Sequence, residues 1–182
     1  SNFTNLLLAF RQDITQKQYK NFDSLLSYCK KSANPVGRII LELNNIKSDE
    51  AMFYSDKICT ALQLTNFLQD VVEDFEKERI YLPLEDIEKY NFDISNIKSK
   101  INGNNFQNLM RYQVDRVNKY YKEGAQLLPI LPFRLRQQIK WTINGGVGIL
   151  RKIENINYDV LNYKPIYSKL DFIKLLLNLE IK

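Results

Sequence analysis

One stretch of the chain, residues 63–83, constrains the fold more than any other. Its apolar residues recur with the period of about 3.6 residues that defines an α-helix. Asp70 and Asp74 stand four residues apart in it, so both carboxylates project from the same side of that helix. Most of the remaining circumference is apolar, which is typical of a buried helix. We therefore expect a long central helix over residues 49–78, whose narrow polar stripe faces an internal, wet cavity.

The polar stripe of this helix joins the two aspartates to amides and to further charged groups. Its members are Gln63, Asn66, Asp70, Glu73, Asp74 and Lys77. Two neighbouring carboxylates repel each other unless a cation lies between them, and burying one without a partner is costly. Mg²⁺ suits this position because it takes one or two protein carboxylates and completes its octahedron with waters and phosphate oxygens. The alternative is a solvated acidic face balanced by Lys77 and Arg79, because aspartate pairs at this spacing are common.

The rest of the chain follows helical periodicity, and no strand alternation competes with it. With six glycines and five prolines in 182 residues, the composition also favours helices. Asp23 is a candidate N-cap, and Pro35 predicts a break at Asn34 because proline cannot continue the hydrogen-bond ladder. Further helices are expected over residues 5–14, 84–90, 106–125, 133–157 and 168–179, with Glu85, Asp86 and Glu88 on the exposed side of the second of these. We predict an all-α fold and a single domain over residues 1–182.

Composition excludes several classes of site. Histidine is absent, which removes serine–histidine and cysteine–histidine catalysis and leaves oxygen-ligated hard ions such as Mg²⁺ as candidate metals. Cys29 and Cys59 lack metal-ligand spacing, which favours a reduced, cytoplasmic protein. The net charge of +5 suits an anionic substrate or contact with the inner face of a membrane. We find no nucleic-acid-binding signature and no glycine-rich dinucleotide motif.

Two features outside the stripe each leave two interpretations open. Arg79 follows the acidic helix, where its guanidinium can bind a diphosphate in bidentate fashion or pair with Glu76 or Glu78. Gly145 and Gly146 interrupt an otherwise helical segment at a cost of about 1 kcal/mol each relative to alanine. That cost indicates either close helix packing or space for a ligand.

Two segments carry a resemblance to a known family. The run QLTNFLQDVVEDFEKERIYLP, residues 63–83, resembles the second aspartate-rich motif of the squalene/phytoene synthases. The run YCKKSANPVGR, residues 28–38, is similar to that family's tyrosine–cysteine helix with its break. With Gly145-Gly146 and residues 156–160, the resemblance covers nearly the whole chain. The variants ANPVG and FLQD point to the branch of bacterial hydroxysqualene synthases in hopanoid biosynthesis.

The resemblance implies an isoprenoid-synthase-type helical bundle around a central cavity. Its reaction is the Mg²⁺-dependent ionisation of a prenyl diphosphate, with a sheltered carbocation as intermediate. The assignments are catalytic roles for Asp70, Asp74, Arg79 and Tyr28, substrate contacts for Gln63, Asn66, Tyr81 and Val36, and metal ligation for Asp70, Asp74 and Asn66. Ordinary core packing is the alternative for Tyr28.

The implied enzyme is a head-to-head prenyl transferase that converts presqualene or farnesyl diphosphate to hydroxysqualene or squalene. Two departures qualify it. Gln69 stands where many relatives have arginine, and the family's first aspartate-rich motif, expected N-terminal to Ser1, is not in this chain. We therefore expect the C-terminal portion of such a domain, without its N-terminal helices and weak or inactive by itself. The alternative is a non-catalytic relative that acts as an assembly or interaction protein.

Overall fold

The structure, a computed structural model, describes residues 2–176 as a set of helices. They are α1 (Asn2–Thr15), α2 (Phe22–Ser32), α3 (Asn34–Leu43), α4 (Asp49–Gln69), α5 (Val71–Glu76), α6 (Leu84–Lys89), α7 (Ser95–Lys98), α8 (Asn104–Gly124), the 3₁₀ turn η1 (Ala125–Ile130), α9 (Phe133–Asn155) and α10 (Lys169–Leu176). Within residues 2–176 the only β-type pairing is an isolated bridge between Gln18 and Ile80. The all-α prediction is confirmed.

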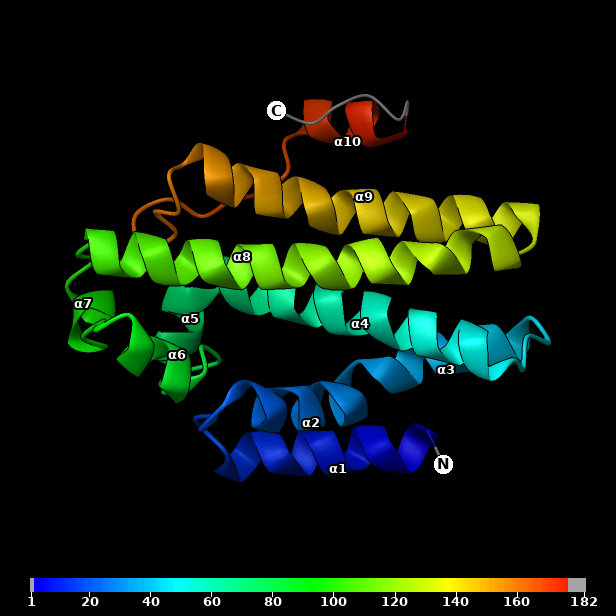
Figure 1. Cartoon of the computed structure of the whole chain (residues 1–182), viewed down its shortest axis with the longest axis horizontal. Helices are drawn as coiled ribbons and strands as arrows, with labels where there is room; N and C mark the ends of the chain where they lie inside the picture. Colours follow the sequence, from blue (N-terminus) through cyan, green and yellow to red (C-terminus); the bar gives the residue numbers. More distant parts are fainter. Residues whose placement is uncertain (1, 177–182) are drawn as a thin grey trace.

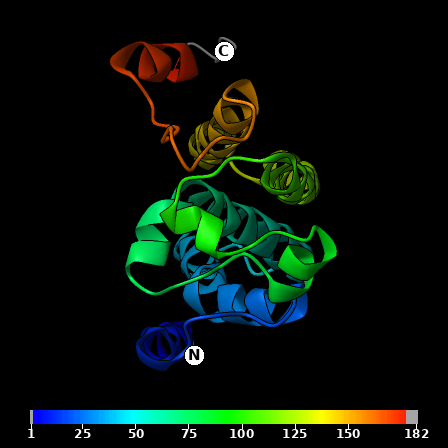
Figure 2. The ribbon, with the colours of Figure 1, turned by 90° about the vertical axis from the view of Figure 1, so that its left-hand side faces the viewer.

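The long helices lie roughly alongside one another, with α4 in the middle (Figure 1). On one side α4 packs against α2 and α3, and on the other against α8 and α9. Helix α1 lies outside α2 and α3 at one edge of the molecule, and α10 lies outside α9 at the opposite edge (Figures 1 and 2). The short helices α5, α6 and α7 cluster at one end of the bundle (Figure 1). Asp70, Glu73 and Asp74, which we call the acidic motif, lie at this end, in and just before α5.

Local capping explains where the N-terminal helices begin. The side chain of Ser48 accepts a hydrogen bond from the Ala51 amide and starts α4. Asn21 and Ser24 form a reciprocal capping box, so α2 begins at Phe22 and the expectation of Asp23 as its cap is wrong. The predicted break at Asn34 is present, because α2 ends at Ser32 and α3 begins at Asn34.

The expected continuous helix over residues 49–78 is interrupted at Asp70. Asp70 has φ −105° and ψ 23°, outside the α-helical values, so α4 ends at Gln69 and α5 begins at Val71. Hydrogen bonds still connect the two parts: the Asp70 amide donates to the Asn66 carbonyl, and the Asp70 carbonyl accepts from the Asp74 amide. The backbone is thus bent at Asp70 rather than unwound.

Asp86 is buried, so its expected place on the exposed side of its helix is wrong. Only 3% of its surface is exposed. Its carboxylate lies 2.7 Å from Nη1 of Arg116 and accepts a hydrogen bond of 2.9 Å from the Gln113 amide, both on α8. A buried carboxylate needs such partners, and they bind α6 to α8.

The glycine pair in α9 serves close packing. A Cβ on Gly146 would lie 1.8 Å from the hydroxyl oxygen of Tyr121 on α8. The carbonyl of Gly145 accepts a hydrogen bond from the hydroxyl of Tyr167. Beyond α9, the expected last helix appears as α10, and residues 177–179 of that prediction lie outside the described residues. None of the helices between residues 2 and 176 is long and apolar enough to cross a bilayer.

Candidate prenyl diphosphate site

Asp70 and Glu73 share a cation that the chain itself supplies. The ammonium of Lys164, from the segment after α9, lies 2.7 Å from Oδ1 of Asp70 and 2.7 Å from Oε1 of Glu73. Each of the two acidic side chains is 38% exposed. Burial opposes ionisation of Glu73, but the hydrogen bond with Lys164, a backbone hydrogen bond and the positive charges of Lys164 and Lys77 together outweigh burial and lower the pKa of Glu73. Asp70 and Glu73 are therefore partly exposed and paired, rather than enclosed in the expected internal cavity.

Asp74 is half-buried and lines a small hollow. Burial, followed by the nearby charge of Asp70, raises the pKa of Asp74 from 3.8 to about 6, and Lys77 and Arg79 only partly oppose this. The Asp74 carboxylate is therefore ionised at neutral pH but held at a cost. A carboxylate in this condition favours the arrival of a cation.

Four aromatic rings lie together near Asp74. Tyr81 lies parallel to Phe67, with ring centroids 3.8 Å apart, and its centroid is 6.0 Å from that of Tyr28 and 5.7 Å from that of Tyr19. All four rings are buried. Burial is the main cause that raises the pKa of Tyr19, Tyr28 and Tyr81, so these phenols stay neutral at physiological pH. We call these four rings the aromatic cluster.

Arg79 and Asp13 border the aromatic cluster. Nη2 of Arg79 donates a hydrogen bond of 3.3 Å to the backbone carbonyl of Asp13 at the end of α1. The carboxylate of Asp13 hydrogen-bonds with Tyr28 and raises the pKa of that phenol. Two buried polar atoms here, Nε of Arg79 and Oδ1 of Asp13, have no hydrogen-bond partner among the described residues. Arg79 forms no ion pair with Glu76 or Glu78 in that part of the chain, so its guanidinium retains an unused donor.

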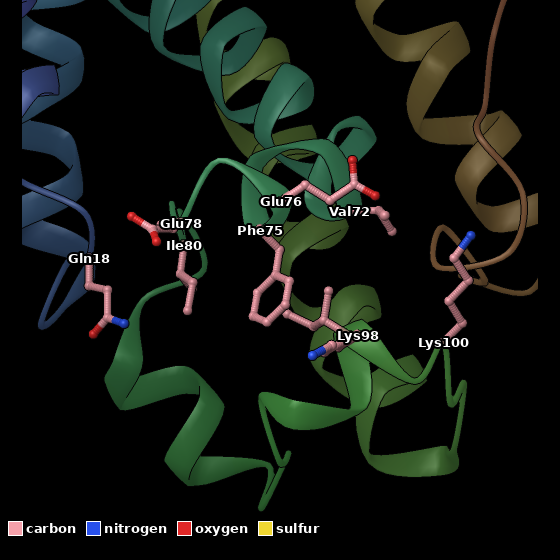
Figure 3. A pocket seen from close by; sticks show the side chains of 9 residues that line it. Gln18, Val72, Phe75, Glu76, Glu78, Ile80, Lys98 and Lys100 are labelled. Carbon is pink, nitrogen blue, oxygen red and sulfur yellow. The ribbon is translucent and has the colours of Figure 1, made fainter.

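Two hollows lie near the acidic motif. The smaller one is lined by Asp74, Arg79 and Tyr81 among others; its volume of about 10 Å³ holds at most about one water molecule. The larger one, of about 620 Å³, lies against α5 and α7 and is lined by neither Asp70 nor Asp74 (Figure 3). Apolar residues and exposed charged residues line it, namely Val72, Phe75, Ile80, Ile97, Glu76, Glu78, Lys98 and Lys100. The larger of these two hollows is thus adjacent to the predicted site but is not formed by its carboxylates.

The structure brings most of the predicted site residues together and leaves others apart. Asp74, Arg79 and Tyr81 line one hollow, and Tyr28 belongs to the same aromatic cluster as Tyr81. Gln63 is half-buried and Asn66 is exposed, both on α4 before Asp70. Val36 is 47% exposed on α3 and lines neither hollow.

Three residues near the site were not predicted from the sequence. Asp13, Tyr19 and Lys164 each lie far along the chain from the residues that they contact. Their only signals in the sequence are an acidic residue and a tyrosine in or after an amphipathic helix, and a lysine before a proline. None of these is specific enough to predict a site.

The donor groups suit a hard divalent cation. Asp70, Asp74 and Asn66 offer carboxylate and amide oxygens, which Mg²⁺ prefers. In the described part of the chain, no group of three or more acidic, histidine or cysteine side chains lies close enough together to hold a metal ion. Two carboxylates nevertheless fit Mg²⁺, because that ion retains waters and takes substrate phosphate oxygens as further ligands.

The chain is similar in sequence to known synthases. The 15-cis-phytoene synthase of Synechocystis is 30% identical over 183 residues, which cover 92% of this chain and 54% of that relative. The hydroxysqualene synthase of Zymomonas mobilis is 44% identical over 80 residues, which cover 43% of this chain and 27% of that relative. The chain thus spans little more than half the length of the phytoene synthase that it matches.

Solved structures show the same fold. The crystal structure of the squalene synthase HpnC from Alicyclobacillus acidocaldarius superposes with a TM-score of 0.84 at 34% identity, covering 86% of this chain and 60% of that one. A dehydrosqualene synthase crystallised with a ligand gives a TM-score of 0.89 at 25% identity, covering 97% of this chain and 62% of that one. A model of the squalene/phytoene synthase family matches residues 1–171. With the paired aspartates, the aromatic cluster and this fold in place, the chain belongs to the squalene/phytoene synthase family.

Proposed function

We propose that the complete protein is a Mg²⁺-dependent head-to-head prenyl transferase that ionises a prenyl diphosphate. One observation carries the proposal: Asp70 lies at the bend where α4 ends, and Asp74, four residues on, lines a hollow together with Arg79 and with Phe67 and Tyr81 of the aromatic cluster. Ionisation of a diphosphate is favoured by a hard cation, by a hydrogen-bond donor to the leaving group and by neutral aromatic rings. These residues would supply all three. Membership of the family supports the same reaction class.

Each residue has a distinct task in this proposal. Asp70, Asp74 and Asn66 would hold Mg²⁺. The bound ion would neutralise negative charge on the diphosphate. The carbon–oxygen bond breaks, its electron pair leaves with the diphosphate, and an allylic or cyclopropylcarbinyl cation remains. Arg79 donates an N–H to the departing oxygen, and its Nε is free to do so. Tyr28 and Tyr81 present neutral rings whose faces attract a cation.

For the substrate we propose presqualene diphosphate or its precursor farnesyl diphosphate, with hydroxysqualene or squalene as product. The support is the identity of 44% and 42% with two hydroxysqualene synthases over the 80 residues that they share with this chain. The structural likeness to a squalene synthase is consistent with it.

The test is turnover by the complete gene product. Presqualene and farnesyl diphosphate are each incubated with Mg²⁺ or with EDTA, and the hydrocarbon products are identified by mass spectrometry. We expect Mg²⁺-dependent product from the wild type and at least about a 100-fold loss in Asp70→Asn and Asp74→Asn, because each loses a charged ligand of the diphosphate-bound metal. A protein that is folded by circular dichroism but turns over neither substrate would sink the proposal and favour the assembly or interaction protein.

A further inference from the structure

The segment that follows α9 is fixed onto the acidic motif at several points. Lys164 contacts both Asp70 and Glu73 at 2.7 Å. Next to it, Nε2 of Gln69 donates a hydrogen bond of 2.5 Å to the carbonyl of Pro165. Residues 164 and 165 are therefore tied to the junction of α4 and α5 by one ionic and one neutral contact.

A third contact ties the same segment to α9. The hydroxyl of Tyr167 donates to the carbonyl of Gly145. The lysine side chain thus projects from a segment that is anchored at two points just after it, Pro165 and Tyr167. A surface lysine paired by chance has no such backbone support, and ion pairs of that kind contribute little.

The ammonium of Lys164 contacts Oδ1 of Asp70, an oxygen that a metal ion held by Asp70 and Asp74 could also use. An oxygen of Asp70 that is 2.7 Å from an ammonium cannot also be 2.0–2.1 Å from a Mg²⁺ ion without strong repulsion between the two cations. Lys164 and a metal ion therefore cannot both contact Oδ1 of Asp70 at the same time. The neutral amide of Gln69 can lie beside the ammonium without adding a second positive charge.

We propose that Lys164 is a resident counter-ion of the acidic motif. Its ammonium leaves Asp70 when a divalent cation binds, so that metal binding removes the ionic contact of the segment 162–168. This inference rests on the proposed function, because it takes Asp70 as a metal ligand. Before the metal arrives, Lys164 neutralises Asp70 and Glu73 and keeps their repulsion from Asp74 small. After the metal binds, the segment keeps its neutral contacts through Gln69 and Tyr167 but loses its ionic one.

The first experiment measures Mn²⁺ binding to the complete gene product by electron paramagnetic resonance, without substrate. We expect Lys164→Gln to bind Mn²⁺ about two- to fivefold more tightly than the wild type, since a competing ion pair of modest strength is removed. Lys164→Arg retains the positive charge and should stay within about twofold of the wild type. Lys98→Gln, which removes the same charge from an exposed position on α7, controls for the change in net charge.

The outcomes separate this inference from the function on which it rests. Equal affinities of the wild type, Lys164→Gln and Lys98→Gln, with loss of binding in Asp70→Asn, overturn the counter-ion role and leave the metal site standing. Weaker binding by Lys164→Gln also overturns it. Mn²⁺ binding that is unaffected by Asp70→Asn in every background overturns both the metal site and the counter-ion.

A second experiment follows the lysine itself. Acetylation by N-hydroxysuccinimide acetate requires a free, deprotonated amine, and the ion pairs with Asp70 and Glu73 protect Lys164 from it. Mass spectrometry should show Lys164 acetylated at least about twofold faster when Mg²⁺ is saturating, while the rate at Lys98 stays constant. An unchanged rate at Lys164 under conditions where Mn²⁺ binding is measured contradicts the release of this side chain.

Discussion

The hydroxyl of Tyr121 occupies the space that a side chain at position 146 would need. An ideal Cβ on Gly146 would lie 1.8 Å from that oxygen. The same hydroxyl shares a buried hydrogen bond of 2.9 Å with the hydroxyl of Thr65 on α4. One phenol therefore joins α4, α8 and α9 at the core of the bundle, and its position depends on the absence of a Cβ at residue 146.

Gly146→Ala should therefore destabilise the fold. The added methyl group displaces the Tyr121 ring and breaks its hydrogen bond with Thr65, which should lower the free energy of unfolding by about 2–4 kcal/mol. Urea unfolding followed by circular dichroism measures the change. Gly103→Ala is the matched control, because a Cβ there meets nothing within 4 Å, and it should cost less than about 1 kcal/mol. Equal midpoints for the two variants would contradict the packing role of Gly146.

Asp86→Ala should destabilise the protein through loss of its partners. The substitution leaves the Arg116 guanidinium half-buried without its carboxylate and Gln113 without an acceptor, at a cost of about 3–5 kcal/mol. Thermal unfolding at neutral pH provides the measurement. The control is Glu88→Ala on the same helix, where the side chain is exposed and a change within about 0.5 kcal/mol is expected.

Asp74→Asn should stabilise the metal-free protein at neutral pH. The folded-state pKa of Asp74, about 6, exceeds its ordinary value of 3.8, so folding favours the protonated carboxyl and the ionised form destabilises the fold. The variant should gain about 1 kcal/mol above pH 6, a value discounted for solvent screening because the group is only half-buried. The gain should shrink as the pH falls from 6 and vanish below about pH 4. Unfolding in urea at pH 4, 5 and 7 tests this dependence.

Asp74→Asn should also change metal affinity and stability in opposite directions. Asp74→Asn removes a charged metal ligand, so Mn²⁺ affinity should fall by at least about tenfold while the melting temperature at pH 7 rises. Asp115→Asn, an exposed residue on α8, should change neither quantity appreciably. A variant that loses both stability and metal binding would instead assign Asp74 a structural role.

Arg79→Lys should reduce turnover more than it reduces metal binding. Lysine keeps the charge but not the planar donors, so the departing diphosphate loses a directed N–H, and kcat should fall by about 100- to 1,000-fold. Mn²⁺ affinity measured without substrate should stay within about twofold of the wild type, because Arg79 is not a metal ligand. Arg134→Lys on α9 is the control, with an exposed side chain and unchanged kcat.

The helices themselves were predictable because helix formation depends on neighbours within a few residues. The apolar period and Pro35 as a break each act over one or two turns, and α3 begins close to Pro35. The bend at Asp70 was not predictable in this way. Residues 63–78 keep a helical pattern throughout, and only the contacts around the junction set the backbone of Asp70 outside the helical region.

Asp86 and Lys164 show where local reasoning fails at a site. The local pattern places Asp86 on the polar side of a short helix, and only the approach of α8 brings Arg116 and Gln113 to it. Lys164 reaches Glu73 across 91 positions of sequence, a separation at which periodicity carries no information. The pairing of each charge depends on which helices pack together, and this is decided after the helices have formed.

The sequence alone determined that this chain is helical, and it predicted that Asp70 and Asp74 project from the same side of the chain. Both follow from helical spacing. Only the tertiary structure decided how exposed Asp70 is, which cation pairs with it, and that Tyr19 and Asp13 adjoin Tyr28 and Tyr81. Burial and charge pairing arise from contacts between distant segments, and these contacts exist only once α1, α4 and the segment after α9 lie together.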